Sequence, residues 1–312
     1  MPTSPVRPDA PAPAPPWTVA VLGPGGVGGL LAALLARAGH RVICLAGPAT
    51  AAVLREDGLR VRSAQFGDFS VPVEAAAELR EPVDLCLVTV KNTQLEEALG
   101  RVPRGLLGQG LVLPLLNGVE HLAALTRHFG EGRVVPGVIR VESTRVAPGV
   151  VEHGSPFTEI DLAGPAERLG TLRAVLRAAG VTVEAAGDES ALLWTKLAFL
   201  APFALLTTWY GMTIGEVRTE RRAELVAVLK EAAAVGGACG ASVDVARSLA
   251  LYEAFPSDAR SSMQRDAEAG RPLELDAIGG ALLRAARRHG VSVPVAARLV
   301  ADLERRHRTV AQ

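Results

Sequence analysis

One lysine lies in an otherwise apolar stretch of the sequence, and a lysine in that setting can do chemistry. Residues 194–206 read WTKLAFLAPFALL, and Lys196 is the only charged residue among them. Taking an ammonium out of water lowers the lysine pKa unless an anion pairs with it, which makes proton donation easier near neutral pH. Lys196 is therefore a candidate general acid, although a lysine can also extend its charged end out of an apolar helix into water. This stretch alone does not decide between the two.

Residue types that the chain otherwise avoids mark further candidates. Only three of its 33 basic residues are lysines, Lys91, Lys196 and Lys230, and only two asparagines occur, Asn92 and Asn117. A rare residue type is more often kept for its chemistry than for packing. Lys230 lies in an amphipathic segment, VLKEAAA, where a solvent-exposed helix face accounts for it. The other four remain candidates for a functional site.

A glycine-rich loop offers a second kind of chemistry, phosphate binding. The segment GPGGVG (23–28) follows a short β-rich run and precedes a helical run, which gives the pattern G-x-G-x-x-G. Gly23 permits the tight turn, Gly25 lets the backbone approach a pyrophosphate, and Gly28 lets helix and strand pack closely. The helix N-terminus supplies free N–H groups and a partial positive charge. We predict a dinucleotide site with contacts at Gly23, Gly25, Gly26 and Gly28.

The choice between NAD and NADP depends on the ends of the strands. An acid at the end of the second strand would bind the ribose 2′-hydroxyl of NAD, but that strand ends in Leu45-Ala46-Gly47. Lys91 follows the apolar run VDLCLVTV (83–90), where its cation can reach the cofactor edge of the sheet. A cation there favours the 2′-phosphate, so we predict NADP (NADPH). The alternative is that Lys91 is merely solvated at the strand end.

These residues require a fold that brings distant loops together. Residues 18–47 read strand, glycine loop, helix and strand, which is a right-handed parallel unit. Further apolar runs predict strands buried on both faces, with helices starting near Thr93 and Val119. The predicted strands are 18–23, 41–47, 83–90, 111–118, 134–143, 158–164 and 181–186, and the last helix between them is 166–179. The fold class is therefore α/β, with a Rossmann-type doubly wound parallel sheet over residues 17–187.

The pattern changes to helical at residue 188, which predicts an all-helical substrate and catalytic domain over residues 188–312. Apolar periodicity places helices at 189–209, 221–240, 243–254, 257–269 and 272–289, with a last helix after Pro294. Asp188 and Thr219 are suitable N-cap residues. The apolar run 197–206 is shorter than the roughly 20 residues of a membrane span, so we interpret it as part of a buried core helix.

Composition narrows the function classes. The chain has 33 Lys+Arg and 33 Asp+Glu among 312 residues, so no nucleic-acid or membrane partner is indicated. The cysteines and histidines show no metal-ligand spacing, so no metal site is predicted, and sparse cysteines indicate a cytoplasmic protein. Residues 1–16 are rich in proline and alanine and lack the apolar core of a signal peptide, so we interpret them as a disordered tail.

Taken together, the motifs resemble those of the ketopantoate reductases (2-dehydropantoate 2-reductases) over nearly all of residues 18–308. The matching segments are GPGGVG (23–28), VKNTQ (90–94), LLNGVE (115–120), WTKL (194–197), SSMQRD (261–266), LELD (273–276) and HGVSVP (289–294). Each segment alone is a weak signal, but their order and spacing together are specific. The resemblance implies a Rossmann domain followed by a helical domain, as the strand and helix patterns also predict.

The resemblance implies a role for each matching residue. Lys196 falls on the catalytic lysine of the family, and Asn117 on an asparagine that positions cofactor, substrate and lysine. Ser262 falls on the serine that binds the substrate carboxylate. Glu274 falls on the acid that holds the lysine and the substrate hydroxyl region. The family's K-x-x-Q cofactor contacts fall on Lys91 and Gln94.

The reaction that the resemblance implies is the reduction of a 2-oxo acid, or a related ketone, by NADPH. As hydride reaches the ketone carbon, the ketone oxygen gains negative charge, which the Lys196 ammonium can stabilise before it delivers a proton. Glu274 would supply the charge pairing that keeps this lysine from becoming neutral. Ketopantoate as the substrate would place the protein in pantothenate biosynthesis.

Three positions depart from the family pattern. The family usually has asparagines four and eight residues after the catalytic lysine, where this chain has Leu200 and Ala204. A substrate site at Leu200 and Ala204 suggests a bulkier or more apolar substrate, in a member repurposed for specialised metabolism. Gly47 replaces an arginine often found after the second strand, which weakens the preference for NADP without indicating NAD.

Two further functions stay open at the level of sequence. A repurposed member could bind NADP and catalyse a non-redox cyclisation or isomerisation, or the chain could sense dinucleotides without catalysis. The intact glycine loop counts against loss of the cofactor, and the Lys196 and Glu274 pair counts against a pure sensor. A homodimer also stays open, because helical domains of this kind often pair.

Overall fold

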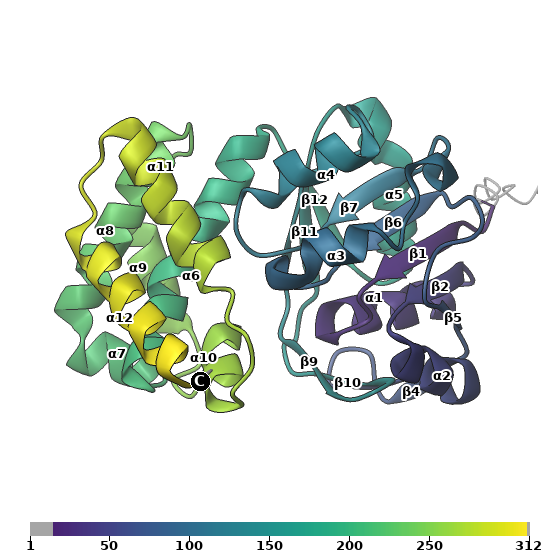
Figure 1. The fold of residues 1–312 in the computed structure, drawn as a ribbon, viewed down its shortest axis with the longest axis horizontal. Helices are drawn as coiled ribbons and strands as arrows, with labels where there is room; N and C mark the ends of the chain where they lie inside the picture. Colours follow the sequence, from purple (N-terminus) through teal and green to yellow (C-terminus); the bar gives the residue numbers. More distant parts are fainter. Residues whose placement is uncertain (1–14, 311–312) are drawn as a thin grey trace, which may run out of the picture.

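The computed structural model describes residues 15–310, and its two parts lie side by side (Figure 1). The first part contains the sheets and ends with β12 (Thr182–Ala186), and the helical second part begins with α6 (Glu189–Tyr210). The predicted α/β fold with a helical C-terminal domain is thus confirmed. Apart from Pro15 and Pro16, the predicted tail lies outside the described residues.

A parallel five-stranded sheet forms the centre of the first part. Its order is β5-β2-β1-β6-β7. The bounds are β1 Thr18–Leu22, β2 Arg41–Leu45, β5 Glu74–Ala76, β6 Leu85–Val88 and β7 Leu111–Pro114. Because all five strands run parallel, their carboxyl ends meet at one edge. Gly23, Lys91 and Asn117 follow β1, β6 and β7 at this edge.

Helices cover both faces of this sheet, which explains why its strands are continuous apolar runs. Val19 and Val21 of β1 belong to one buried cluster with α1, whereas Ala20 and Leu22 face the other way into a cluster with α3 and α4. The helices of this part are α1 Gly26–Arg37, α2 Pro48–Asp57, α3 Leu95–Leu99, α4 His121–Phe129 and α5 Ala166–Ala178.

Two smaller sheets complete the first part, and the sequence pattern predicted them only in part. One has the order β4-β3-β10-β9 and the other β12-β11-β8. Their bounds are β3 Leu59–Ser63, β4 Phe69–Val71, β8 Gly137–Arg140, β9 Ser143–Ala147, β10 Val150–His153 and β11 Glu159–Ala163. The strand predicted at 134–143 is therefore wrong as a single element. Its residues divide between β8, which pairs antiparallel with β11, and the start of β9, which belongs to the other sheet.

The helical part follows the predicted order with three differences. Its further elements are α7 Ile214–Glu220, α8 Arg222–Ala238, α9 Val245–Ala254, α10 Ser262–Glu268, a π-helix Asp276–Gly280, α11 Ala281–His289 and α12 Pro294–Val310. α7 was not predicted. The helix expected from residue 257 begins only at Ser262, after a turn, and the helix expected over 272–289 contains the π-helical segment.

One of the two predicted helix caps is confirmed. Asp188 is the N-cap of α6, and its carboxylate accepts a hydrogen bond from the Ala191 N–H at 2.7 Å. Thr219 is not an N-cap. It lies inside α7, where its hydroxyl donates to the carbonyls of Gly215 and Glu216, and Arg221 takes the N-cap position of α8.

The apolar helix α6 forms the core of the helical part. Its 22 residues are long and apolar enough to cross a membrane by composition alone, but 61% of the apolar window is buried inside the protein. Leu197, Ala201 and Leu205 are among its residues that pack with α8, α11 and α12 in one cluster. Packing against these helices buries the apolar surface of α6, as predicted for a core helix.

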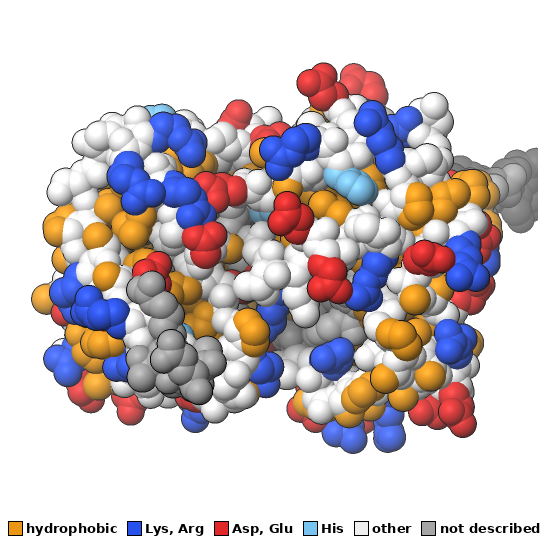
Figure 2. Space-filling model, viewed as in Figure 1, with side chains coloured by type: hydrophobic (Ala, Val, Ile, Leu, Met, Phe, Trp, Pro, Cys, Tyr) orange, Lys and Arg blue, Asp and Glu red, His pale blue; other side chains and the backbone are white. Residues whose placement is uncertain are grey.

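Charged side chains of both signs are interspersed over the face in Figure 2. This distribution agrees with the formal net charge of zero.

Candidate functional site

The glycine loop after β1 has the shape that a phosphate-binding turn requires. Gly23 has a φ of +89°, and a Cβ there would lie 2.6 Å from Val90 Cγ1. A Cβ on Gly28 would lie 2.2 Å from Thr89 Oγ1, so only glycine lets α1 pack this closely. Gly25 differs, because the nearest atom to its added Cβ is 3.9 Å away. The open side of Gly25 therefore leaves space for a phosphate.

The N-terminus of α1 lies directly behind this loop. The helix begins at Gly26, and neither a side-chain cap nor an acid in its first turn occupies its free N–H groups. Gly26 itself packs against β9, since a Cβ would lie 2.2 Å from the Ser143 carbonyl oxygen. The loop and helix together fit the pyrophosphate of a dinucleotide.

Lys196 lies on α6 and is partly buried. No hydrogen bond or ion pair joins its ammonium to another residue in the described range 15–310. Burial lowers the pKa of Lys196 to about 8, Glu274 opposes this shift, and the Arg140 cation adds to it. A lysine with this pKa can donate a proton near neutral pH.

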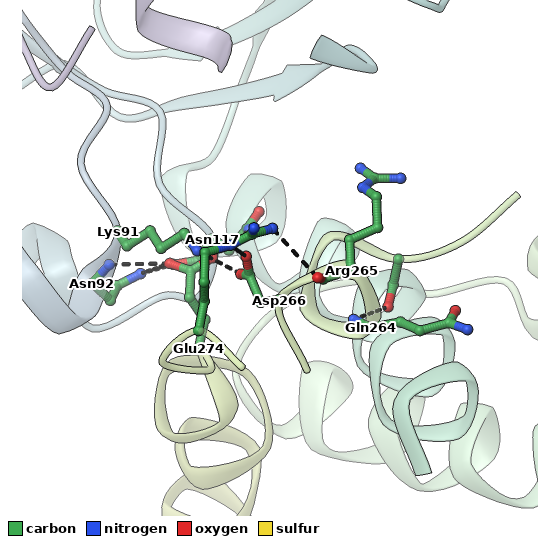
Figure 3. A network of polar contacts seen from close by, with 9 residues as sticks. Lys91, Asn92, Asn117, Gln264, Arg265, Asp266 and Glu274 are labelled. Atoms are coloured by element: carbon green, nitrogen blue, oxygen red, sulfur yellow. Dashed lines mark hydrogen bonds and ion pairs between the residues drawn. The ribbon is translucent and has the colours of Figure 1, made fainter. Parts of the chain in front are cut away.

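Glu274 is 8% exposed and lies in a network that joins the two parts of the protein (Figure 3). Its carboxylate accepts hydrogen bonds from the Asn92 N–H at 3.0 Å and from the Asn117 side-chain amide at 3.0 Å. The Asn92 side-chain amide donates to the Asn117 carbonyl at 2.6 Å. Both asparagines of the chain thus meet one buried carboxylate. Asn92 was a candidate because asparagine is rare in the chain, although the family resemblance assigned it no role.

Lys91 forms a second contact across the two parts. Its ammonium lies 2.6 Å from Asp266, which also pairs with Arg271 at 2.9 Å. Asp266 is not an ordinary acid on a helix surface, because its side chain is only 8% exposed and binds two cations. Gln94, the other K-x-x-Q residue, is exposed and is the N-cap residue of α3.

The residues assigned to the substrate differ in accessibility. Ser262 is exposed at the start of α10, whereas Ser261 is the buried N-cap and bonds with Thr207 at 2.8 Å. Leu200, one helical turn after Lys196, is partly exposed. Ala204 is only 1% exposed and belongs to the buried cluster of the helical part. Ser262 and Leu200 are therefore accessible from outside, whereas Ala204 is packed inside the helical part.

His121 is a buried residue near this site that the sequence analysis missed. It is the first residue of α4 and is 3% exposed. Neither ring nitrogen has a hydrogen-bond partner among the described residues. Burial, with a smaller contribution from the Lys196 cation, lowers the His121 pKa to about 4. The ring is therefore neutral at physiological pH.

Comparison with known proteins identifies the family. The family model "Ketopantoate reductase PanE/ApbA" matches residues 19–163, and the model of its C-terminal part matches residues 190–306. A 2-dehydropantoate 2-reductase of Mycobacterium tuberculosis is 32% identical over 289 residues, which cover 90% of this chain and 95% of that protein. One from Caulobacter vibrioides is 30% identical, covering 92% and 98%.

Solved structures agree with this result. A PanE/ApbA family ketopantoate reductase from Ralstonia eutropha has a TM-score of 0.86 and 30% identity, over 95% of this chain and 100% of that chain. A D-mandelate dehydrogenase with NADH and anilino(oxo)acetate has a TM-score of 0.87 over 95% and 100%, and at 20% identity it shows the shared fold alone. With both family models matched in chain order, this protein belongs to the ketopantoate reductase family of oxidoreductases.

Proposed function

We propose that the protein is an NADPH-dependent reductase of a 2-oxo acid, with Lys196 as the general acid. The observation that carries this proposal is the meeting of three groups from both parts of the chain. Asn117 bonds to Glu274 at 3.0 Å, and the charge of Glu274 acts on the partly buried Lys196. A reductase needs such an arrangement at the carbonyl that it reduces.

Lys196 is suited to protonate the product oxygen. With a pKa of about 8, about nine in ten of these side chains carry the proton at pH 7. A nicotinamide cofactor, when bound, would supply the hydride for the ketone carbon. The Lys196 ammonium stabilises the negative charge on the oxygen and transfers its proton there. General acid catalysis of this kind contributes about 10²–10⁴-fold to the rate.

Glu274 and Asn117 support this step. Glu274 remains near enough to Lys196 to raise its pKa, so the lysine stays protonated despite burial. Asn117 follows β7 at the cofactor edge of the sheet, and its amide donates to Glu274. Ser262 presents an exposed hydroxyl for the substrate carboxylate. These four residues are the proposed catalytic and substrate-binding set.

The preference for NADPH rests on the end of β2. Gly47 is the N-cap of α2, and the first turn of that helix, all within the described residues, carries no acid to bind a ribose 2′-hydroxyl. Lys91 adds a cation at the same sheet edge, although Asp266 neutralises much of its charge. The missing acid is therefore the stronger support. NADPH and NADH should be compared with the same substrate, and a preference for NADH would contradict this part of the proposal.

The substrate is proposed to be 2-dehydropantoate or a 2-oxo acid with a larger apolar group. Leu200 supports an apolar neighbour for the ketone, because it is partly exposed one turn beyond Lys196. With 2-dehydropantoate as the substrate, the protein would act in pantothenate biosynthesis in the cytoplasm. The relatives' reductase activity gives no support to a non-redox reaction or to a sensor.

The test follows NADPH absorbance with 2-dehydropantoate and with 2-oxo acids that carry larger apolar groups. Lys196→Ala should lower kcat by about 10²–10⁴-fold, because it removes the proton donor. Lys230→Ala is the matched control, since Lys230 is exposed on α8, and it should retain wild-type rates. Tight NADPH binding without turnover of any 2-oxo acid would contradict the proposed reductase function.

A further inference from the structure

His121 is a buried polar side chain without a partner in the described part of the protein. Leaving buried ring nitrogens unpaired costs free energy, and proteins rarely keep such a group without a use. A neutral imidazole has one nitrogen that accepts and one that donates a hydrogen bond. One ring nitrogen of His121 can therefore accept a hydrogen bond from a partner, and the other can donate one.

Packing places His121 beside the start of α6. The neighbouring Leu122 belongs to a small buried cluster with Val138 of β8 and Leu193 of α6. Leu193 and Lys196 are three residues apart, so they lie on the same side of α6. The first turn of α4 thus packs on the helix face that carries Lys196, and the two side chains are close enough for the lysine charge to act on the imidazole.

The two charged groups that act on Lys196, Glu274 and Arg140, are both bound by other residues, so neither fixes where its ammonium points. Glu274 attracts it from the chain before the π-helix, but its carboxylate is already bound by Asn92 and Asn117. Arg140 of β8 repels it and is itself paired with Glu159 and Asp161. Among the described residues, His121 is a buried acceptor without a partner, and the element that carries it packs against the start of α6.

We propose that His121 is a positioning residue for Lys196. Its neutral ring accepts a hydrogen bond from the Lys196 ammonium and aims that ammonium at the ketone oxygen. In the structure the two groups are not hydrogen bonded, so the lysine would have to rotate about its side-chain bonds to reach the ring. After the lysine has given its proton to the product oxygen, the neutral amine still has N–H groups, so it can donate to the same ring nitrogen while His121 keeps its tautomer. This inference rests on the proposed function of Lys196.

The test compares His121→Leu with His121→Asn in the full-length protein, with NADPH oxidation measured across pH. Leucine cannot accept a hydrogen bond, whereas asparagine has both an acceptor and donors. His121→Leu should lower kcat by about 10- to 100-fold through loss of orientation, with little change in the KM for NADPH. The rate should also begin to fall about one pH unit earlier as pH rises, because the ammonium loses a stabilising acceptor.

The Asn variant and stability separate positioning from a structural role. His121→Asn should restore kcat to within a few-fold of wild type and return the pH profile. His121→Leu should melt at or above the wild-type temperature, because it removes unpaired buried nitrogens. His128→Leu on the same helix is the control, since His128 already bonds to the Val102 carbonyl at 3.1 Å, and its pH profile should match wild type.

Two results would overturn the inference while leaving the reductase proposal standing. One is an active wild type whose pH profile and kcat are unchanged in His121→Leu. The other is a His121→Asn variant as slow as His121→Leu, with both melting well below wild type. Failure of the wild type to oxidise NADPH with any 2-oxo acid would instead overturn the proposed function, and the inference with it.

Discussion

At the scale of single residues, the site combines one shifted lysine with one buried carboxylate. The carboxylate is held by both asparagines of the chain, so its position does not depend on the lysine. The pKa of Lys196 is set mainly by burial, and no hydrogen bond or ion pair joins its ammonium to another described residue. The anion is thus fixed by its own hydrogen bonds, separately from the proposed proton donor.

The pH dependence of the reduction should reflect Lys196. The lysine pKa falls from 10.5 to about 8, and the protonated form is the active one. Activity should therefore be full below that value and fall as pH rises through about 8, measured as kcat/KM of the free enzyme. Glu274→Gln removes the anion that raises this pKa, so its profile should fall at lower pH. A profile of that variant displaced to higher pH would contradict the assignment.

Leu200 should influence which 2-oxo acid is preferred. Leu200→Asn places a polar amide one turn beyond Lys196, so it should lower kcat/KM for 2-oxo acids with large apolar groups relative to 2-dehydropantoate. A change of about tenfold in this ratio is expected from the loss of one apolar contact. Leu251→Asn is the control, because Leu251 is 50% exposed on α9. Equal ratios in both variants would exclude Leu200 from the substrate site.

At the scale of elements, two glycines of the loop have different roles: Gly28 allows close packing, and Gly25 is proposed to contact the cofactor phosphate. Gly28→Ala should destabilise the fold by roughly 1–3 kcal/mol through overpacking, because its Cβ would lie 2.2 Å from Thr89 Oγ1. Gly25→Ala should fold normally, since the nearest atom is 3.9 Å away, but it should weaken NADPH binding. Thermal melts and cofactor titration measure the two effects. Normal NADPH affinity in Gly25→Ala would contradict the proposed phosphate contact.

Elements with a strong local signal could be predicted from the sequence. The predicted helix 189–209 matches α6 (Glu189–Tyr210), because Asp188 caps it and apolar residues fill it. β3 and β10 could not be predicted in this way. They pair with each other across about 90 residues, and a short local pattern does not indicate so distant a partner. The π-helix at Asp276–Gly280 likewise follows from packing that helical periodicity does not show.

The candidate site likewise contains residues that the sequence could indicate and residues that only packing brings into place. Lys196, Asn117 and Glu274 were predicted as site residues from rare residue types and from the resemblance, and the structure brings Asn117 and Glu274 into contact. His121 could not be identified, because its burial without partners exists only after α4 packs on α6. The pairing of Asp266 with Lys91 could not be predicted for a similar reason, since the two residues are 175 apart in the sequence.

At the scale of the whole molecule, the two parts meet through backbone as well as side chains. Gly118 has a φ of +82°, and a Cβ there would lie 2.4 Å from the Ala277 carbonyl oxygen in the π-helix. This close backbone contact, next to Asn117, fixes how near the two parts of the protein lie to each other. Light scattering can measure whether two such molecules form the homodimer that the sequence leaves open.

Gly118→Ala should force the two parts apart and weaken the Asn117–Glu274 bond. We expect a lower kcat and a loss of stability of roughly 2–4 kcal/mol, from strain at positive φ together with the clash. Gly39→Ala is the matched control, because Gly39 has a φ of +91° but nothing within 4 Å of its added Cβ. Thermal melts and NADPH oxidation check both variants. Equal losses of kcat in the two would show that the clash with Ala277 does not matter.

Asn117 is followed by glycine, the sequence most prone to spontaneous deamidation, because glycine leaves its backbone nitrogen free to attack the side-chain amide. In the folded protein that amide donates to Glu274 at 3.0 Å, and the Asn117 carbonyl accepts from Asn92 at 2.6 Å. Conversion to aspartate would place a second carboxylate against Glu274, where like charges repel. We therefore expect Asn117 to deamidate more slowly while its contacts to Glu274 and Asn92 are intact, and mass spectrometry of aged samples would follow this reaction.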